Sequence, residues 1–288
     1  MYLFYIGCDT IRREVVAMRI GIIGLGSIGQ MLVKALCKSG VISPENVIVY
    51  NRTREKAEIL QAAYGITVAQ NAQEICEQAD HIFLCTKPLD ILPILGGLVV
   101  SAEKHVISVA AGVSISDLEK SHAGPVSKVI PTVTSQELHG VSLFTCSTRV
   151  SAEQRSEFVS LLSAIGTAQE VTEDVIETAT IISSSAPGLI AGILESFAMA
   201  AVRKTPQLDI ETARSILVET MLGTALLLKN EQLSFDQLIT QVATKGGITE
   251  EGLRVLDKTL PGGFDELFAM TESKHAMLKE LLQQQIAK

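Results

Sequence analysis

The stretch Met18-Arg19-Ile20-Gly21-Ile22-Ile23-Gly24-Leu25-Gly26-Ser27-Ile28-Gly29 decides the fold class. Residues 18–23 form a short apolar run that predicts a buried strand, and residues 27–38 repeat apolar positions at helical spacing. A strand that leads through Gly-x-Gly-x-x-Gly into a helix is typical of a dinucleotide-binding Rossmann domain. An ordinary glycine-rich turn is the alternative, but the matching strand and helix favour the dinucleotide site.

Each residue of the glycine segment has a predicted role at that site. Gly24 permits the tight turn, Gly26 lets a pyrophosphate approach the backbone, and Gly29 lets the helix pack closely on the strand. The N–H groups at the start of the helix, around Ser27 and Ile28, face the anion. We therefore expect all five residues to bind the cofactor.

The residues after the second predicted strand, Tyr50-Asn51-Arg52-Thr53-Arg54, distinguish NADP from NAD. An NAD site places an acidic residue there, which would repel a 2′-phosphate. Arg52 instead offers a charge-assisted hydrogen bond to that phosphate, and Asn51 and Thr53 offer further donors. The two arginines are alternatively solvated surface residues, although cations at a helix start are unfavourable without an anionic ligand. The pattern predicts NADPH.

Two further loops follow predicted strands at the edge where open α/β sheets bind ligands. The first contains Thr86, Lys87 and Pro88, and the second is the small-residue segment Ser108-Val109-Ala110-Ala111-Gly112-Val113-Ser114. Small side chains allow the nicotinamide end of a cofactor to lie against the backbone. We expect Thr86, Lys87, Pro88, Ala110, Ala111 and Gly112 to bind the cofactor, with a plain surface charge as the alternative for Lys87.

The alternation of strand and helix patterns predicts an α/β fold up to about residue 170. Further strands are expected at residues 46–50, 66–69, 81–85, 105–109, 126–130 and 141–144. Gly40 is expected to end the helix after the first strand, and Asn71 to cap a helix that runs through Gln78. Ser151 with Gln154 forms a capping box for a helix that ends at Gly166. Beyond Thr172 the periodicity is almost entirely helical, at 174–183, 187–204, 209–229, 234–244, 249–260 and 263–284. We expect a Rossmann domain at 18–170, an all-α dimerisation domain at 171–288, and a flexible extension at 1–17.

Composition limits the partners of the chain. It has 288 residues, a net charge of −8, 47% hydrophobic residues and no tryptophan, which argues against nucleic acid and anionic membranes. The uncharged stretch from Thr178 to Leu194 is at the short edge of a membrane span and is interpreted as a buried helix. Five scattered cysteines and five scattered histidines indicate neither disulfides nor a metal site, and favour a cytoplasmic protein.

From Met18 onward the chain resembles the pyrroline-5-carboxylate reductase family. The resemblance rests on the glycine loop, Asn51-Arg52-Thr53, Lys87-Pro88, residues 110–114, and Ser184-Ser185-Ala186-Pro187-Gly188 before a helix that carries Glu195. Its most specific block is Val242-Ala243-Thr244-Lys245-Gly246-Gly247-Ile248-Thr249, followed by Gly252-Leu253.

The resemblance implies NADPH-dependent reduction of the cyclic imine Δ1-pyrroline-5-carboxylate to proline by a homodimer. It also implies that Thr249 hydrogen-bonds near the ring nitrogen as the catalytic residue. Backbone N–H groups around Gly246, Gly247 and Ile248 would bind the substrate carboxylate, with Lys245 and Pro187 beside the substrate. Gly246-Gly247 is alternatively a turn between helices with Thr249 as the N-cap.

The sequence departs from the family pattern at positions that concern the substrate. Ile130-Pro131-Thr132-Val133-Thr134-Ser135 replaces the family's Met-Pro-Asn-Thr-Pro-Ala, and Lys245 replaces a proline. These changes are similar to a divergent paralogue such as the late competence proteins of Gram-positive bacteria. A reductase of another imine or a keto acid, and a cofactor-binding regulatory protein without turnover, therefore remain alternatives. A β-hydroxyacid dehydrogenase would need a lysine within residues 187–197, and none is present.

The predicted helices of the second half are apolar on most faces, which is more than a small domain buries alone. Residues 179–201 and 214–228 carry this property most clearly. We expect an obligate dimer with interleaved helices, and a self-contained bundle is the alternative.

Overall fold

The computed structural model describes residues 18–286, so the predicted extension at residues 1–17 lies outside the described residues. The chain divides into two compact units. One contains the described residues up to Ser185 together with those from Glu272 onward, and the other runs from Ala186 to Thr271. This division differs from the predicted boundary at residue 170, because the helix after the sheet and the end of the chain join the first unit.

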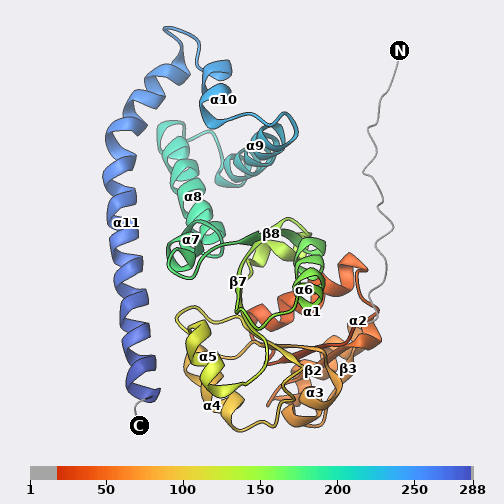
Figure 1. The fold of residues 1–288 in the computed structure, drawn as a ribbon. Helices are drawn as coiled ribbons and strands as arrows, with labels where there is room; N and C mark the ends of the chain where they lie inside the picture. The colour runs from red at the N-terminus through yellow and green to blue at the C-terminus, as the bar shows by residue number, and fades with distance from the viewer. Residues whose placement is uncertain (1–17, 287–288) are drawn as a thin grey trace. The chain divides into compact units, whose positions relative to one another are not determined.

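The first unit is built on one sheet with the strand order β3-β2-β1-β4-β5-β6-β7-β8 (Figure 1). Neighbouring strands are parallel except β6 and β7, which are antiparallel, so β7 and β8 run opposite to the other strands. The strands are β1 (Ile20–Ile23), β2 (Val47–Tyr50), β3 (Thr67–Val68), β4 (His81–Leu84), β5 (His105–Ser108), β6 (Val126–Ile130), β7 (Gly140–Cys146) and β8 (Gly166–Glu170).

Helices cover both faces of this sheet, as buried parallel strands require. The helices are α1 (Ser27–Ser39), α2 (Arg54–Tyr64), α3 (Ala72–Gln78), α4 (Pro88–Gly96), α5 (Ile115–Ser121), α6 (Ala152–Ala164) and α7 (Ile176–Ile182), with 3-10 turns η1 (Pro44–Asn46) and η2 (Val133–Glu137). Residues of α1, α2 and α6 share one apolar core, and residues of α3, α4 and α5 share another. Both cores are almost wholly aliphatic, with Phe83, Phe144 and Phe158 as the buried aromatics.

The predicted start and end signals of the helices lie where the sequence placed them. Gly40 ends α1 in the left-handed conformation, Asn71 caps α3 through the N–H of Glu74, and Ser151 and Gln154 form the capping box of α6. Two elements had not been expected. β8 has an exposed Gly-Thr-Ala-Gln-Glu sequence without an apolar pattern, and α5 is a single short helix behind the small-residue loop.

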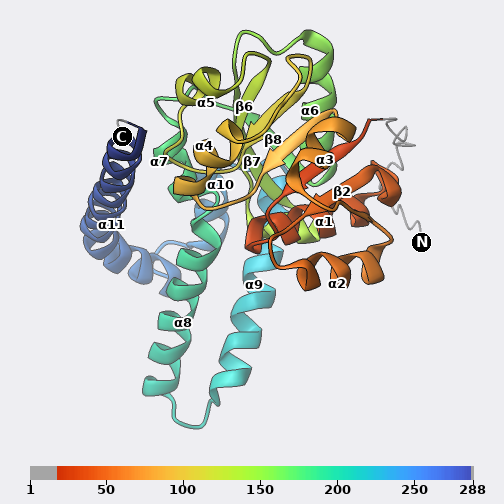
Figure 2. The ribbon, with the colours of Figure 1, turned by 90° about the horizontal axis from the view of Figure 1, so that it is seen from below.

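The second unit is entirely helical. It contains α8 (Ala186–Lys204), α9 (Ile210–Asn230), α10 (Phe235–Val242) and the first part of α11 (Ile248–Ile286). Helices α8 and α9 run side by side, and Arg214 Nε donates to Glu195 Oε2 over 2.9 Å between them (Figure 2). The prediction of two helices at 249–260 and 263–284 was wrong, since α11 continues through Pro261 despite the backbone hydrogen bond that proline removes.

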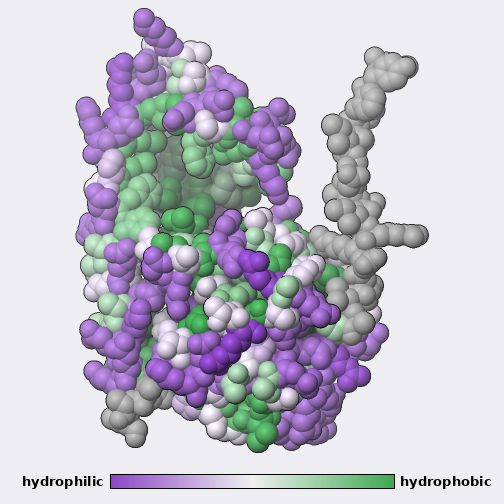
Figure 3. All heavy atoms as spheres, viewed as in Figure 1, coloured by the Kyte–Doolittle hydropathy of each residue, from purple (hydrophilic) through white to green (hydrophobic). Residues whose placement is uncertain are grey.

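Large apolar side chains are exposed on the helices of the second unit. Figure 3 shows hydrophobic residues gathered over this part of the chain. Those from α8 and α9 are Ile190, Ile193, Phe197, Met199, Ile216, Val218, Met221, Leu222, Leu226 and Leu227. The prediction of a buried helix over 178–194 is therefore wrong for the single chain. Residues 176–204 are also long and apolar enough to cross a membrane, by length and composition alone.

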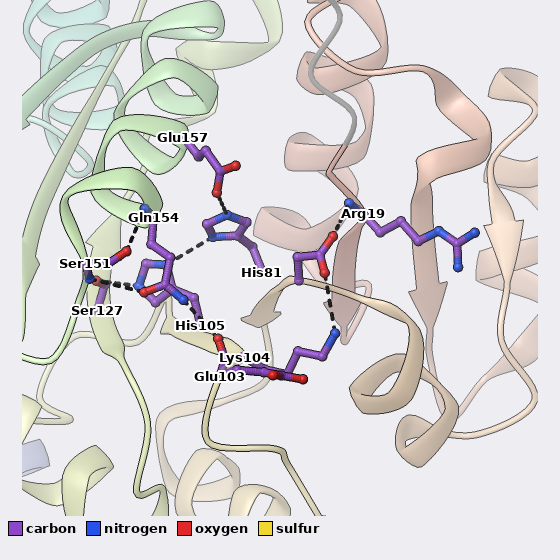
Figure 4. Close-up of polar contacts among 10 residues, drawn as sticks. Arg19, His81, Glu103, Lys104, His105, Ser127, Ser151, Gln154 and Glu157 are labelled. Atoms are coloured by element: carbon purple, nitrogen blue, oxygen red, sulfur yellow. Dashed lines mark hydrogen bonds and ion pairs between the residues drawn. The ribbon is translucent and has the colours of Figure 1, made fainter.

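Two histidines are buried at the start of neighbouring strands in the first unit (Figure 4). His81 Nδ1 lies 3.0 Å from His105 Nδ1, His81 Nε2 lies 3.1 Å from Glu157 Oε2, and His105 Nε2 lies 2.7 Å from Ser127 Oγ. Burial, together with the smaller effects of neighbouring His81 and His122, lowers the pKa of His105 to about 3. Burial also lowers the pKa of His81, against the opposing effect of Glu157. Both rings are therefore neutral at neutral pH.

This pair predicts a loss of stability in mild acid. Unfolding releases the histidines to their ordinary pKa of about 6.5, so below that pH the unfolded chain binds more protons and the free energy of unfolding falls. For His105 alone we expect a loss of about 2 kcal/mol between pH 7 and pH 5. Urea unfolding of the native chain and of His105→Gln at both pH values measures this loss, and the variant should show a smaller difference. His139→Gln, which changes an exposed histidine, should retain the native difference; equal differences in all three proteins would contradict the assignment.

Candidate functional site

A groove of about 850 Å³ lies in the first unit, at the carboxyl ends of β1, β2, β4 and β5. Nearly all the residues predicted to bind the cofactor line it: Gly24, Gly26, Ser27, Ile28, Asn51, Arg52, Thr53, Thr86, Lys87, Pro88, Ala110 and Ala111. Gly29 and Gly112 do not. Four segments that are separate in the sequence thus meet along one continuous groove.

The three glycines of the turn meet different surroundings. Gly24 has a left-handed φ of 100°, and a Cβ there would lie 2.8 Å from the carbonyl oxygen of Cys85. A Cβ on Gly29 would lie 2.0 Å from the carbonyl oxygen of Gly24, so only glycine lets α1 start this close to the turn. A Cβ on Gly26 would meet nothing within 4 Å. Gly29 therefore acts beneath the groove, whereas Gly26 leaves open backbone at its surface.

The start of α1 is suited to an anion. Its N-cap, Gly26, provides no side-chain cap, and the first turn contains no acidic residue. The free N–H groups at such a helix end attract negative charge. The groove thus has room and backbone donors for a pyrophosphate at the start of α1, and the acidic residue of its lining, Asp90, belongs to α4.

Asn51 holds the glycine turn against the loop after β2. Its Oδ1 accepts the N–H of Leu25 at 2.9 Å, and its Nδ2 donates to the carbonyl oxygen of Thr53 at 2.8 Å. These bonds use most of the amide that the sequence assigned to the phosphate, and leave one N–H of Nδ2 free. The main contribution of Asn51 is therefore to position the turn.

Three cations stand at the start of α2, and their surroundings differ. Arg54 pairs with Glu58 at 2.9 Å, donates to Gln70 at 3.2 Å, and does not line the groove. Arg52 and Lys56 do line it, and neither forms an ion pair with any residue from 18 to 286. The sequence interpretation missed Lys56, which lies in the first turn of α2, four residues after Arg52.

The opposite wall of the groove comes from the loops after β4 and β5. Thr86 Oγ1 is buried there and has no hydrogen-bond partner among the described residues. Lys87 is exposed and is the N-cap of α4, whose first residue is Pro88. Gly112 has a φ of 85°, and Leu282 of α11 lies 3.3 Å from where its Cβ would be. Gly112 turns the loop and does not line the groove, so its contact with the cofactor stays a prediction.

The residues assigned to the substrate lie in the second unit, around the turn before α11. Gly246 has a φ of 71°, its N–H donates to Glu250 Oε2 at 2.7 Å, and the N–H of Gly247 donates to the carbonyl oxygen of Thr244 at 2.8 Å. The N–H groups of both glycines, predicted to bind a carboxylate, are thus used within the chain, and that of Ile248 is not. Thr249 is the second residue of the helix and not its N-cap.

The remaining predicted substrate residues are solvent-accessible. Ile248 is 93% exposed, and Lys245 is exposed without an ion pair to any described residue. Pro187 is the second residue of α8, where a proline costs no helical hydrogen bond. No group of three or more His, Cys, Asp or Glu side chains within 18–286 is arranged to hold a metal ion.

Comparison with known proteins matches both halves of the chain. Residues 19–112 match the family described as NADP oxidoreductase coenzyme F420-dependent, and residues 173–278 match the family described as pyrroline-5-carboxylate reductase dimerisation. The first match covers the groove, and the second covers the Gly246-Gly247 turn and the exposed apolar helices.

Individual relatives extend over nearly the whole chain. Pyrroline-5-carboxylate reductase 3 of Bacillus subtilis is 34% identical, with 91% of this chain and 97% of the relative covered. ComE operon protein 4 of the same organism is 31% identical, with 90% and 95% covered. The crystal structure of 1-pyrroline-5-carboxylate reductase from Streptococcus pyogenes has a TM-score of 0.79 at 25% identity, with 90% of this chain and 98% of the other covered. The chain belongs to the pyrroline-5-carboxylate reductase family.

Proposed function

We propose that the chain reduces Δ1-pyrroline-5-carboxylate to L-proline with NADPH in the cytoplasm. Family membership supports an NAD(P)-dependent oxidoreductase, and the Bacillus subtilis relative that is 34% identical is named as a pyrroline-5-carboxylate reductase. The observation that carries the cofactor assignment is that two cations, Arg52 and Lys56, line the same groove as the glycine turn and pair with no carboxylate among residues 18–286.

The residues of the groove fit NADPH. The N–H groups at the start of α1 would bind its pyrophosphate over Gly26, where the backbone is open. Arg52 and Lys56 would hold the 2′-phosphate, with the Thr53 hydroxyl as a further donor. The orphaned Thr86 hydroxyl and the small residues Ala110 and Ala111 suit the nicotinamide end.

Bound NADPH supplies a hydride, which the imine carbon accepts while the ring nitrogen takes a proton. A protonated imine is a better electrophile than a neutral one. The protein therefore mainly has to hold the imine carbon in line with the hydride. Thr249 would fix the ring nitrogen through its hydroxyl. The free N–H groups at the start of α11 would hold the carboxylate, with the charge of Lys245 beside it.

A second candidate is a related protein that binds NADPH and reduces another imine or a keto acid, or turns over no substrate. It is favoured by the similarity to ComE operon protein 4 and by the altered loop after β6. In that loop Thr132 is buried and its hydroxyl lies 3.4 Å from that of Thr134. NADPH binding without oxidation in the presence of pyrroline-5-carboxylate would favour this candidate.

We also propose a homodimer formed through α8 and α9. The dimerisation family matches this region, and a second copy would cover the apolar side chains left exposed in one chain. Burial against a second copy would also account for the apolar character of residues 176–204, which are long and apolar enough to span a membrane.

Coenzyme preference should depend on Arg52. Arg52→Asp removes the guanidinium and adds a charge that repels the 2′-phosphate, so we expect the Kd for NADPH to rise about 100-fold and that for NADH to change by less than about threefold. Fluorescence titration with both coenzymes measures this. Arg54→Gln, which removes a cation outside the groove, should leave both affinities unchanged. If both arginine variants lost NADPH equally, the 2′-phosphate assignment would fail.

Turnover should depend on the hydroxyl of Thr249. Steady-state NADPH oxidation with pyrroline-5-carboxylate should fall about 10- to 100-fold in kcat/KM for Thr249→Ala, the worth of one hydrogen bond to a charged group. Thr249→Ser keeps the hydroxyl and should retain most of the activity. If the native chain oxidised no NADPH with this substrate, the proposed reaction would be wrong. If Thr249→Ala were as active as the native chain, the proposed role of Thr249 would be wrong.

The mass in solution should be about twice the 30.9 kDa of one chain. Leu222→Asp places a charge on the apolar face of α9 and should release monomers or aggregates, because a buried unpaired carboxylate is strongly unfavourable. Light scattering coupled to size exclusion measures this at micromolar concentration. Ile59→Asp changes an apolar residue on α2 that is more exposed than Leu222 and should leave the mass unchanged. A monomeric native chain would exclude the dimer.

A further inference from the structure

We propose that Glu250 is a positioning residue for the substrate, because it fixes the glycine turn at the start of α11. The inference rests on the proposed function, in that this turn is assigned to the substrate carboxylate. No motif singled out Glu250, which follows Thr249 directly.

The turn is held from two sides. Glu250 Oε2 accepts the N–H of Gly246 at 2.7 Å, and the carbonyl oxygen of Thr244 accepts the N–H of Gly247 at 2.8 Å. Gly246 lies in the left-handed region with a φ of 71°, and a Cβ on it would meet nothing within 4 Å. Packing therefore does not fix Gly246, and the bond from Glu250 is the contact that restricts its freedom.

The result of this arrangement is a set of donors ready for an anion. The backbone N–H groups of Ile248, Thr249 and Glu250 find no acceptor among residues 18–286, and they stand at the positive end of a long helix. Because the two preceding N–H groups are satisfied internally, a substrate carboxylate has one set of donors to bind. If the turn were mobile, the donors would adopt this arrangement for only part of the time, and the affinity for the carboxylate would fall in proportion.

The negative charge of Glu250 would repel a substrate carboxylate, but Arg254 lies close enough to offset it. Arg254 Nη2 lies 3.5 Å from Glu250 Oε1, and Arg254 Nη1 lies 2.7 Å from Glu251 Oε1. One guanidinium thus faces both carboxylates one turn into the helix. Glu251 touches Arg254 but has no side-chain bond to the turn, which makes it a matched control for Glu250.

The test compares Glu250→Ala, Glu250→Gln and Glu251→Ala by steady-state kinetics with pyrroline-5-carboxylate. We expect Glu250→Ala to raise KM about tenfold, the loss of one hydrogen bond, with kcat within about twofold and the Kd for NADPH unchanged. Glu250→Gln keeps an acceptor oxygen and should restore the native KM, and Glu251→Ala should match the native chain. Equal effects of both alanine variants, or a loss in kcat alone, would overturn the assignment.

Calorimetric titration of the NADP-loaded protein with L-proline supplies a readout that needs no turnover. Glu250→Ala should weaken proline binding about tenfold and Glu251→Ala should not. If the native chain binds proline but reduces no pyrroline-5-carboxylate, the proposed reaction fails while this comparison still decides the role of Glu250. If the native chain does neither, both proposals fail. Circular dichroism of each variant should retain the native helix content.

Discussion

The close approach of α1 to the glycine turn sets the position of everything that binds the cofactor. The backbone of Gly29 lies so near the carbonyl oxygen of Gly24 that a single Cβ would come within 2.0 Å of it. This approach brings the free N–H groups of the helix to the carboxyl edge of β1, where the sheet is open. A larger residue at either glycine would shift the helix, and the pyrophosphate site would lose its donors.

Around this turn, the residues that hold the loops in place differ from those assigned to bind the cofactor. The side-chain amide of Asn51 accepts the N–H of Leu25 and donates to the carbonyl oxygen of Thr53, and so joins the turn to the loop after β2. Arg52 and Lys56, in that loop and in the following helix, line the groove and form no ion pair with any described residue. The second unit repeats the division, because Glu250 fastens the turn before α11 while Thr249 and the neighbouring N–H groups stay free. In each case internal hydrogen bonds hold a loop whose remaining donors face outward.

Local patterns made much of this predictable. The glycine segment, the cap at Asn71 and the capping box at Ser151 depend on neighbouring residues, and the structure agrees with each. Features that depend on contacts between residues far apart in the chain could not be predicted from the sequence. The edge strand β8 is polar and is held by pairing with β7, the passage of α11 through Pro261 breaks a propensity rule, and Leu282 reaches Gly112 from the far end of the chain. Lys56 could have been added from the sequence, because it is a cation only four residues after Arg52, whereas the hydrogen bond from the Gly246 N–H to Glu250 could not.

The central claim is that this chain moves a hydride from NADPH to the carbon of a cyclic imine. The most direct measurement uses NADPH carrying deuterium at the transferred position of nicotinamide C4, incubated with the native protein and unlabelled pyrroline-5-carboxylate, with mass spectrometry and NMR of the product. We expect proline with one deuterium on C5, the ring carbon next to nitrogen, where the imine carbon was. Unlabelled proline, or no proline although the coenzyme is bound, would contradict it.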